Sequence, residues 1–125
     1  MGNKFRWLRL LLGVLWLVIL LLAMLTPGDQ FPEVDYFDFQ DKAIHFACFG
    51  LLSLIWSGVN YSSSKELSPK MIRLNYIIFG ILMGVVLELG QLFVPFRTFD
   101  VYDILANELG GLAGFLTFLN IRRRK

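Results

Sequence analysis

The sequence predicts an all-α membrane protein with four transmembrane helices, from its composition, the length of its apolar runs and the distribution of its basic residues. Of the 125 residues, 56% are hydrophobic and the mean hydropathy is +0.60, far above the apolar share of ordinary soluble domains. The length fits one domain, so residues 1–125 are expected to form a single membrane domain. No nucleic-acid-binding surface is indicated.

The first predicted span covers about residues 7–25. Residues 10–25 are uncharged and rich in leucine, and with the flanking Trp7 and Arg9 the run reaches the roughly 20 residues needed to cross the hydrocarbon core. A secretory signal peptide has a similar pattern, but the residues after this run offer no small-x-small cleavage site. We therefore favour a retained first helix over a cleaved signal.

The second predicted span covers residues 42–59 and carries His45 one turn from its start. Residues 29–41, which precede it, are acidic with interleaved aromatic side chains, and such aromatics favour the water–lipid boundary. The single cysteine, Cys48, lies within this span. It can form no intramolecular disulfide and is expected to be a small packing residue.

The third predicted span covers residues 70–95. Ser68 followed by Pro69 has the form of a helix N-cap with proline at the first helical position, so the helix is expected to begin there. The apolar run is interrupted near its end by Glu88 and Gln91, and Pro95 stops it.

The fourth predicted span covers residues 101–121. It contains Gly110 and Gly114, a small-xxx-small pair that permits close approach of another helix. The chain between residues 60 and 73 is polar and is expected to connect the second and third spans.

The basic residues predict that both termini are cytoplasmic. Cytoplasmic segments of membrane proteins carry an excess of Lys and Arg, and in a four-span arrangement only Lys42 and Arg97 would lie outside. The remaining basic residues all fall on the other side, namely Lys4, Arg6, Arg9, Lys65, Lys70, Arg73, Arg122, Arg123, Arg124 and Lys125. We expect a multi-pass membrane protein with the N- and C-termini in the cytoplasm.

Polar side chains from three predicted helices reach the outer membrane boundary at one depth. They are spaced three or four residues apart in pairs, which puts each pair on one helical face. Ionisable groups are costly in lipid and must face protein or water, so their convergence predicts an outer-leaflet pocket that binds a ligand. The predicted lining residues are Asp41, His45, Glu88, Gln91, Arg97, Asp103 and Asn107.

Structural roles remain alternatives for several of these residues. Asp100 is placed to cap the fourth helix, and Glu88 with Arg97 is either a structural ion pair or part of a functional site. His45 alone on an apolar helix is more often a hydrogen-bonded packing residue than a ligand. However, the four carboxylates of this region outnumber its two basic side chains, which predicts a protonated carboxylate or a bound cation.

The sequence leaves enzymatic activity open. Glu88 and His45 are the candidates for a catalytic general base, but there is no nucleophile triad, phosphate-binding glycine loop or dinucleotide fingerprint. Carboxylate and amide oxygens suit a hard divalent cation, yet no tight ligand spacing is present along the chain, so no metal and no cofactor are predicted.

At these residues the sequence resembles the VanZ-like family, small bacterial membrane proteins named for a member associated with low-level teicoplanin resistance. The resemblance covers roughly residues 35–118. The sequence departs from the family pattern at Phe96, where a glycine is common, and at Glu108, where a small or hydroxyl residue is usual. The matching patterns are Asp41-Lys42-x-x-His45-Phe46-x-x-Phe49, Glu88-x-x-Gln91-x-Phe93-x-Pro95-x-Arg97 and Asp103-x-x-x-Asn107-x-x-Gly110-x-x-x-Gly114.

The resemblance implies a location in the bacterial plasma membrane, a cell-envelope role and tolerance of glycopeptide or lipopeptide antibiotics. The leading hypothesis is a non-enzymatic protein that binds or shields a cell-wall precursor or lipid headgroup. The main alternative is an outer-face hydrolase or transferase acting on a lipid-linked phosphate or headgroup, with Arg97 holding an anion. A third is a structural subunit that assembles through its glycine face.

Overall fold

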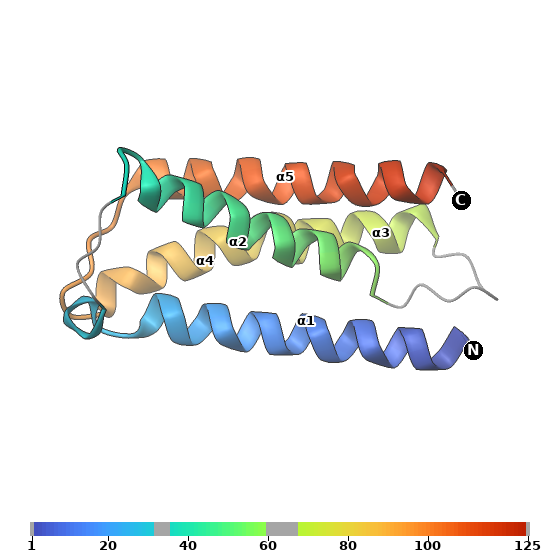
Figure 1. The fold of residues 1–125 in the computed structure, drawn as a ribbon, viewed down its shortest axis with the longest axis horizontal. Coiled ribbons are helices and arrows are strands. Elements are labelled where there is room, and N and C mark those ends of the chain that lie inside the picture. Colours follow the sequence, from blue (N-terminus) through green and yellow to red (C-terminus); the bar gives the residue numbers. More distant parts are fainter. Residues whose placement is uncertain (1, 32–35, 60–67, 125) are drawn as a thin grey trace.

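The structure is a computed structural model that describes residues 2–31, 36–59 and 68–124, and these residues form a bundle of four helical rods (Figure 1). The first rod is α1 (Gly2–Leu25), followed by the short 3₁₀ turn η1 (Gly28–Gln30). The second is α2 (Gln40–Ser57), and the last is α5 (Val101–Arg123). The described ranges contain no strand, so the predicted all-α class with four helices is confirmed.

The third rod is built from consecutive segments: α3 (Pro69–Asn75), η2 (Tyr76–Leu82), α4 (Met83–Gly90) and η3 (Gln91–Phe93). Its predicted start is confirmed, because the Ser68 side chain accepts a hydrogen bond of 3.3 Å from the Met71 amide and Pro69 is the first helical residue. The η2 segment is π-helical, a feature that the apolar run did not predict.

Three of the four rods are long and apolar enough to cross a membrane, namely Lys4–Leu25, Pro69–Phe93 and Val101–Arg123. The exception is α2, whose 18 residues would extend only about 27 Å and begin with charged side chains. The structure thus supports a membrane protein with at least three apolar spans. Whether α2 also crosses the bilayer remains a prediction.

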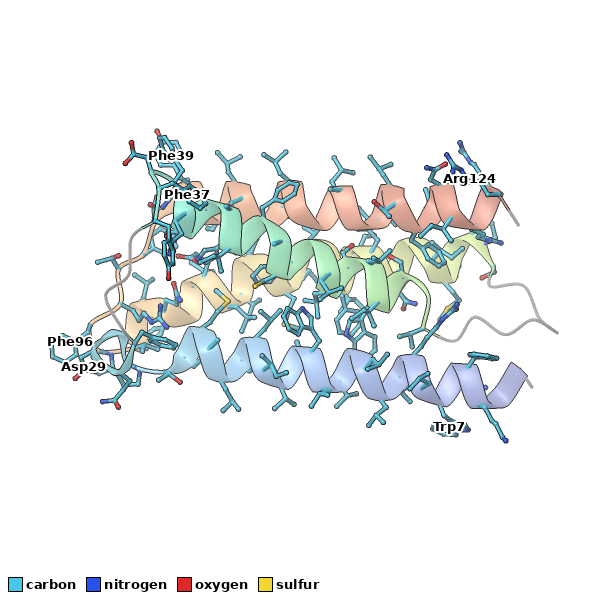
Figure 2. The ribbon with its side chains drawn as sticks, viewed as in Figure 1. Trp7, Asp29, Phe37, Phe39, Phe96 and Arg124 are labelled. Atoms are coloured by element: carbon cyan, nitrogen blue, oxygen red, sulfur yellow. The ribbon has the colours of Figure 1, made fainter. Side chains whose placement is uncertain are left out.

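The bundle has two distinct ends. Both termini and the start of α3 lie at one end, which we call the terminal end (Figure 1). At the opposite end, the link end, are η1, the start of α2 and the link between η3 and α5; Figure 2 shows Asp29 and Phe96 there and Arg124 at the terminal end. Of the residues in the two polar loops, Glu33, Asp35, Ser62, Ser63, Ser64 and Lys65 lie outside the described residues.

The core of the bundle lies between α1, α2 and α4. Trp56 of α2 stacks on Phe79 with ring centroids 3.9 Å apart, and its indole nitrogen donates a 3.1 Å hydrogen bond to the Gly13 carbonyl of α1. Cys48 is half-buried against this core, as the sequence predicts. The buried apolar side chains of the cluster are Leu20, Met24, Phe49, Leu52, Trp56, Val59 and Leu87.

Glycines on α5 bring its backbone into contact with α2. A Cβ atom added at Gly110 would collide with the Phe46 carbonyl, and one added at Gly114 would collide with the Gly50 carbonyl. The close approach predicted from the Gly110/Gly114 pair is therefore confirmed, and it occurs within this chain. Because the two backbones meet there, side chains one and two turns earlier on α5 face the first turns of α2.

Candidate functional site

A buried polar cluster lies at the link end, between α2, α4 and α5. Glu88 and Asn107 have no exposed surface, and Asp103 is only 5% exposed. Burying such groups without partners costs several kcal/mol, so each should be hydrogen-bonded, ion-paired or matched by a cation. The contacts below show which of these applies.

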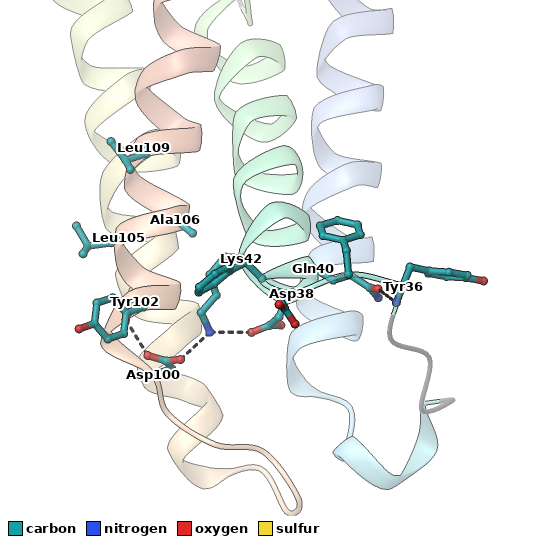
Figure 3. A pocket seen from close by; sticks show the side chains of 12 residues that line it. Tyr36, Asp38, Gln40, Lys42, Asp100, Tyr102, Leu105, Ala106 and Leu109 are labelled. Atoms are coloured by element: carbon teal, nitrogen blue, oxygen red, sulfur yellow. Dashed lines mark hydrogen bonds and ion pairs between the residues drawn. The ribbon is translucent and has the colours of Figure 1, made fainter.

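Lys42 holds three aspartates at the mouth of the cluster. Its Nζ atom lies 2.8 Å from Oδ1 of Asp103, 2.6 Å from Oδ2 of Asp100 and 3.1 Å from Oδ2 of Asp41. These contacts tie the first turn of α2 to the start of α5, and the contact with Asp100 is visible in Figure 3. One ammonium thus faces three carboxylates, which leaves the mouth formally negative.

Asp100 combines the capping role predicted for it with the contact to Lys42. Its Oδ1 accepts a 2.9 Å hydrogen bond from the Tyr102 amide, which caps α5. Its own amide donates to Oε1 of Glu88 over 3.4 Å. The Lys42 ammonium, followed by the Tyr102 amide, lowers the pKa of Asp100 below its usual value.

His45 connects the mouth to the buried residues beneath it. Its Nδ1 lies 2.8 Å from Oδ1 of Asn107, whose amide nitrogen donates a 3.1 Å hydrogen bond to the Gly84 carbonyl. On the other side of the ring, Nε2 lies 3.6 Å from Oδ1 of Asp41 and 3.7 Å from Oδ2 of Asp103. Oε2 of Glu88 is 4.0 Å from Nδ1 and has no hydrogen-bond partner.

Arg97 does not pair with Glu88, so that alternative is wrong. Its Nε and Nη2 atoms donate to the carbonyls of Thr26 (3.0 Å) and Ala23 (2.6 Å), and its guanidinium lies over the Phe31 ring at 4.6 Å. The last carbonyls of a helix have no intrahelical partner and attract positive charge, so Arg97 caps the C-terminus of α1.

Gln91 also binds a carbonyl at the end of α1. Its side-chain nitrogen donates a 3.2 Å hydrogen bond to the Met24 carbonyl, which fastens the end of the third rod to α1. Gln91 and Arg97 nevertheless line a cavity of about 230 Å³ whose wall also includes Asp41 and His45. Five of the seven predicted residues therefore meet in the cluster, and these two approach it across the cavity.

The sequence did not single out Lys42 as a site residue, although Lys42 contacts three of the cluster's carboxylates. The sequence left Glu108 as a packing acid or a secondary member of the site. Glu108 is not among the residues that contact His45 or Asp103. Its Oε1 is buried without a partner, beside Gly84. Ligand binding by any of these residues remains a prediction.

Phe96 explains why a glycine is usual before the arginine. Its φ is 60°, in the left-handed region that glycine enters without strain and that a bulky residue rarely adopts. This turn places the Phe96 carbonyl so close to Gly28 that a Cβ there would collide with it, and the Gly28 amide donates to Pro95 over 3.1 Å. The link therefore packs directly on the chain that leaves α1.

A groove of about 960 Å³ opens beside the cluster, between the starts of α2 and α5 (Figure 3). Charged side chains of Asp38, Lys42 and Asp100 lie at its mouth, and Leu105 and Leu109 continue down α5. The aromatic residues that line it are Tyr36, Phe37, Phe39 and Tyr102. It is a polar opening that continues into an apolar wall.

Comparison with known proteins places these features in a family. The chain is 38% identical over 85 residues to "Uncharacterized protein C11E3.10" of Schizosaccharomyces pombe, an alignment that covers 67% of this chain and 50% of the yeast protein. The chain thus spans about half the length of that curated relative. No solved structure matches the chain. Residues 5–122, nearly the whole described bundle, match the VanZ/LLP1 family, and the chain belongs to that family.

Proposed function

We propose that this protein is a non-enzymatic plasma-membrane protein that binds or shields a lipid headgroup at the link end. The observation that carries the proposal is the groove of about 960 Å³, because its charged mouth and apolar wall match the two parts of a lipid. In this proposal all four helices cross the bilayer, with the basic terminal end in the cytoplasm and the link end in the outer leaflet.

The charges at the groove's mouth favour a headgroup that carries an amine. Asp38, Asp41 and Asp100 face the groove together with the single ammonium of Lys42, so a positively charged group is attracted and a purely anionic headgroup is disfavoured. Lys42 and Tyr102 line the groove and carry donor groups for the phosphate of such a lipid. A zwitterionic aminophospholipid satisfies both requirements.

A lipid is favoured over a cell-wall precursor as the ligand. The relative from Schizosaccharomyces pombe belongs to a fungus, and fungi contain aminophospholipids but no peptidoglycan precursors. In a bacterial envelope, occupation of such a lipid site would reduce access of teicoplanin-type glycopeptides or lipopeptides to their targets. This antibiotic tolerance is the cellular part of the proposal.

Filling the groove tests the binding step. Leu109 is 56% exposed and lines the groove, so Leu109→Trp should reduce the amount of aminophospholipid that copurifies in detergent, measured by mass spectrometry. Leu116→Trp is the matched control, since Leu116 is 53% exposed, lies two turns further along the same face of α5 and is outside the groove. Equal lipid retention by both variants would contradict the proposal.

The cellular part needs a separate measurement. A strain that lacks the protein should bind more labelled teicoplanin and tolerate it less than a strain that expresses it. The Leu109→Trp variant should behave like the deletion, and the Leu116→Trp variant should restore tolerance. Unchanged tolerance in the deletion strain would rule out the antibiotic role. The lipid site would then be tested by the copurification measurement alone.

The second candidate function is an outer-face hydrolase or transferase acting on a lipid-linked phosphate or headgroup. The observation that favours it is Oε2 of Glu88, which is buried, has no hydrogen-bond partner and lies 4.0 Å from Nδ1 of His45. In this alternative Glu88 is the general base and His45 is its neighbour. Arg97 is a weaker candidate for an anion-binding role, because two of its nitrogens are engaged by α1. Identical lipid profiles after incubation with the purified protein and with Glu88→Gln would exclude this function.

A further inference from the structure

The hydrogen bonds around Asn107 determine which nitrogen of His45 carries a proton. The Asn107 amide nitrogen donates to the Gly84 carbonyl at 3.1 Å, so its oxygen is the atom that faces His45. That oxygen is only an acceptor, and it lies 2.8 Å from Nδ1 of His45. The proton of a neutral imidazole therefore sits on Nδ1, which leaves a lone pair on Nε2.

That lone pair faces two carboxylate oxygens. Nε2 lies 3.6 Å from Oδ1 of Asp41 and 3.7 Å from Oδ2 of Asp103, and these ligand atoms all lie within 4.8 Å of one another. The other oxygen of each carboxylate already contacts Lys42, at 3.1 and 2.8 Å. Three electron-pair donors thus point at one space, an arrangement that is repulsive unless a cation lies among them.

A second, independent observation points to the same missing charge. The Glu88 side chain is completely buried and its Oε2 has no hydrogen-bond partner, although it lies 4.0 Å from the His45 ring. Its Oε1 accepts only a long hydrogen bond of 3.4 Å from the Asp100 amide. A buried carboxylate oxygen without a partner is rare, because the cost of removing it from water is not offset. A cation bound at Nε2 of His45 would offset part of that cost.

We propose that Asp41, His45 and Asp103 bind a divalent transition-metal ion of the zinc type. One imidazole nitrogen and two carboxylate oxygens are a donor set that zinc accepts, with a further position left for solvent or a ligand oxygen. At bond lengths of about 2.0–2.1 Å, tetrahedral ligands are roughly 3.4 Å apart, so the two separations from Nε2 of His45, 3.6 and 3.7 Å, need to close by only a few tenths of an ångström.

The surrounding residues have the roles that neighbours of a metal site usually have. Asn107 holds Nδ1 of His45 and so presents Nε2 to the ion, and Lys42 orients both carboxylates. Linear spacing could not predict this site, because the rest of α2 and the whole third rod lie between the Asp41–His45 pair and Asp103 in the sequence. The site adjoins the proposed lipid groove but does not depend on it.

Binding can be measured on the full chain in detergent, purified with a tag that contains no histidine and stripped with a chelator. Titration with ZnCl2 by calorimetry should give about one ion per chain, and CoCl2 should produce the visible absorption of a coordinated ion. His45→Gln and Asp103→Asn should weaken zinc binding at least about 10-fold. Asp29→Asn is the matched control, an exposed acid at the same end (Figure 2) that is neither among the ligands nor in the groove, and should leave affinity unchanged.

Asp41→Asn keeps the test decisive if the buried variants fail to fold. The Asp41 side chain is 64% exposed, so its replacement should preserve the helical circular dichroism spectrum while weakening zinc binding at least about 10-fold. Equal affinity in Asp41→Asn and Asp29→Asn would mean an adventitious ion only. No binding by the folded wild-type protein would also overturn the proposal.

Discussion

The imidazole of His45 on α2 and the amide of Asn107 on α5 meet at 2.8 Å, 62 residues apart in the sequence. The contact depends on the close approach of the two helices at Gly110 and Gly114, and it fixes the orientation of the histidine within the acidic cluster. The predictions below follow from this arrangement and from the link that encloses it.

Removing the Asn107 side chain should destabilise the fold. Asn107→Ala leaves both Nδ1 of His45 and the Gly84 carbonyl without their partner in a buried place, which costs about 1–3 kcal/mol for each unsatisfied group. Thermal unfolding in detergent measures the loss. Asn120→Ala, at an exposed position of the same helix, should change stability by no more than about 0.5 kcal/mol.

Gly114→Ala should separate α5 from α2. Its new methyl group would collide with the Gly50 carbonyl, and backbone atoms cannot yield as a flexible side chain does, so a loss of about 1–3 kcal/mol is expected. Gly90→Ala is the control, because its methyl group would meet only the far end of the Leu25 side chain. Equal unfolding temperatures of the two variants would argue against the observed packing.

Phe96→Gly should stabilise the link. Phe96 has a φ of 60°, and a bulky residue in such a conformation costs on the order of 1 kcal/mol that glycine avoids. Phe93→Gly removes another exposed aromatic ring of the same region without relieving a positive φ, so it should bring no gain. Unfolding by denaturant in one detergent compares the two variants, and a destabilised Phe96→Gly protein would contradict the assignment of strain.

Asp100→Asn should make stability less dependent on pH at the acidic end. Asn caps a helix about as well as Asp, so the substitution isolates the interaction with Lys42. Folding lowers the pKa of Asp100, so its charge stabilises the fold above the unfolded value of about 4, and this contribution disappears as pH falls through the lower folded value. Melting temperatures from pH 3 to 7 should differ between the proteins at neutral pH, and the difference should shrink as pH falls below about 4, whereas a constant difference would contradict the shift.

The sequence predicts the helices well because local signals define them. Ser68 and Asp100 are caps that can be recognised without a structure, and the glycine pair of α5 reports a close approach whichever helix supplies the partner. The shared depth of the polar residues also follows from the lengths of the spans. By contrast, the pairing of Arg97 with carbonyls of α1 leaves no trace in the sequence, because every residue has a carbonyl.

The sequence also did not predict the π-helical segment Tyr76–Leu82 or the role of Lys42. A π-helix differs from an α-helix in its i→i+5 backbone hydrogen bonds, and the apolar residues of this segment would suit either form. In the sequence alone, Lys42 is a charged residue at the start of a predicted helix and nothing marks its partners. Its contacts with Asp100 and Asp103 depend on how α5 lies against α2, which one-dimensional spacing does not fix.

A double-mutant cycle between His45 and Asn107 tests most directly whether separate helices bring their polar side chains together at the link end. Unfolding free energies of the wild type, His45→Ala, Asn107→Ala and the double variant would be measured in detergent with a chelator present. We expect a coupling energy of at least about 1 kcal/mol, because the two side chains share a buried hydrogen bond. Losses that add within about 0.3 kcal/mol would show that the side chains do not meet and would contradict the cluster.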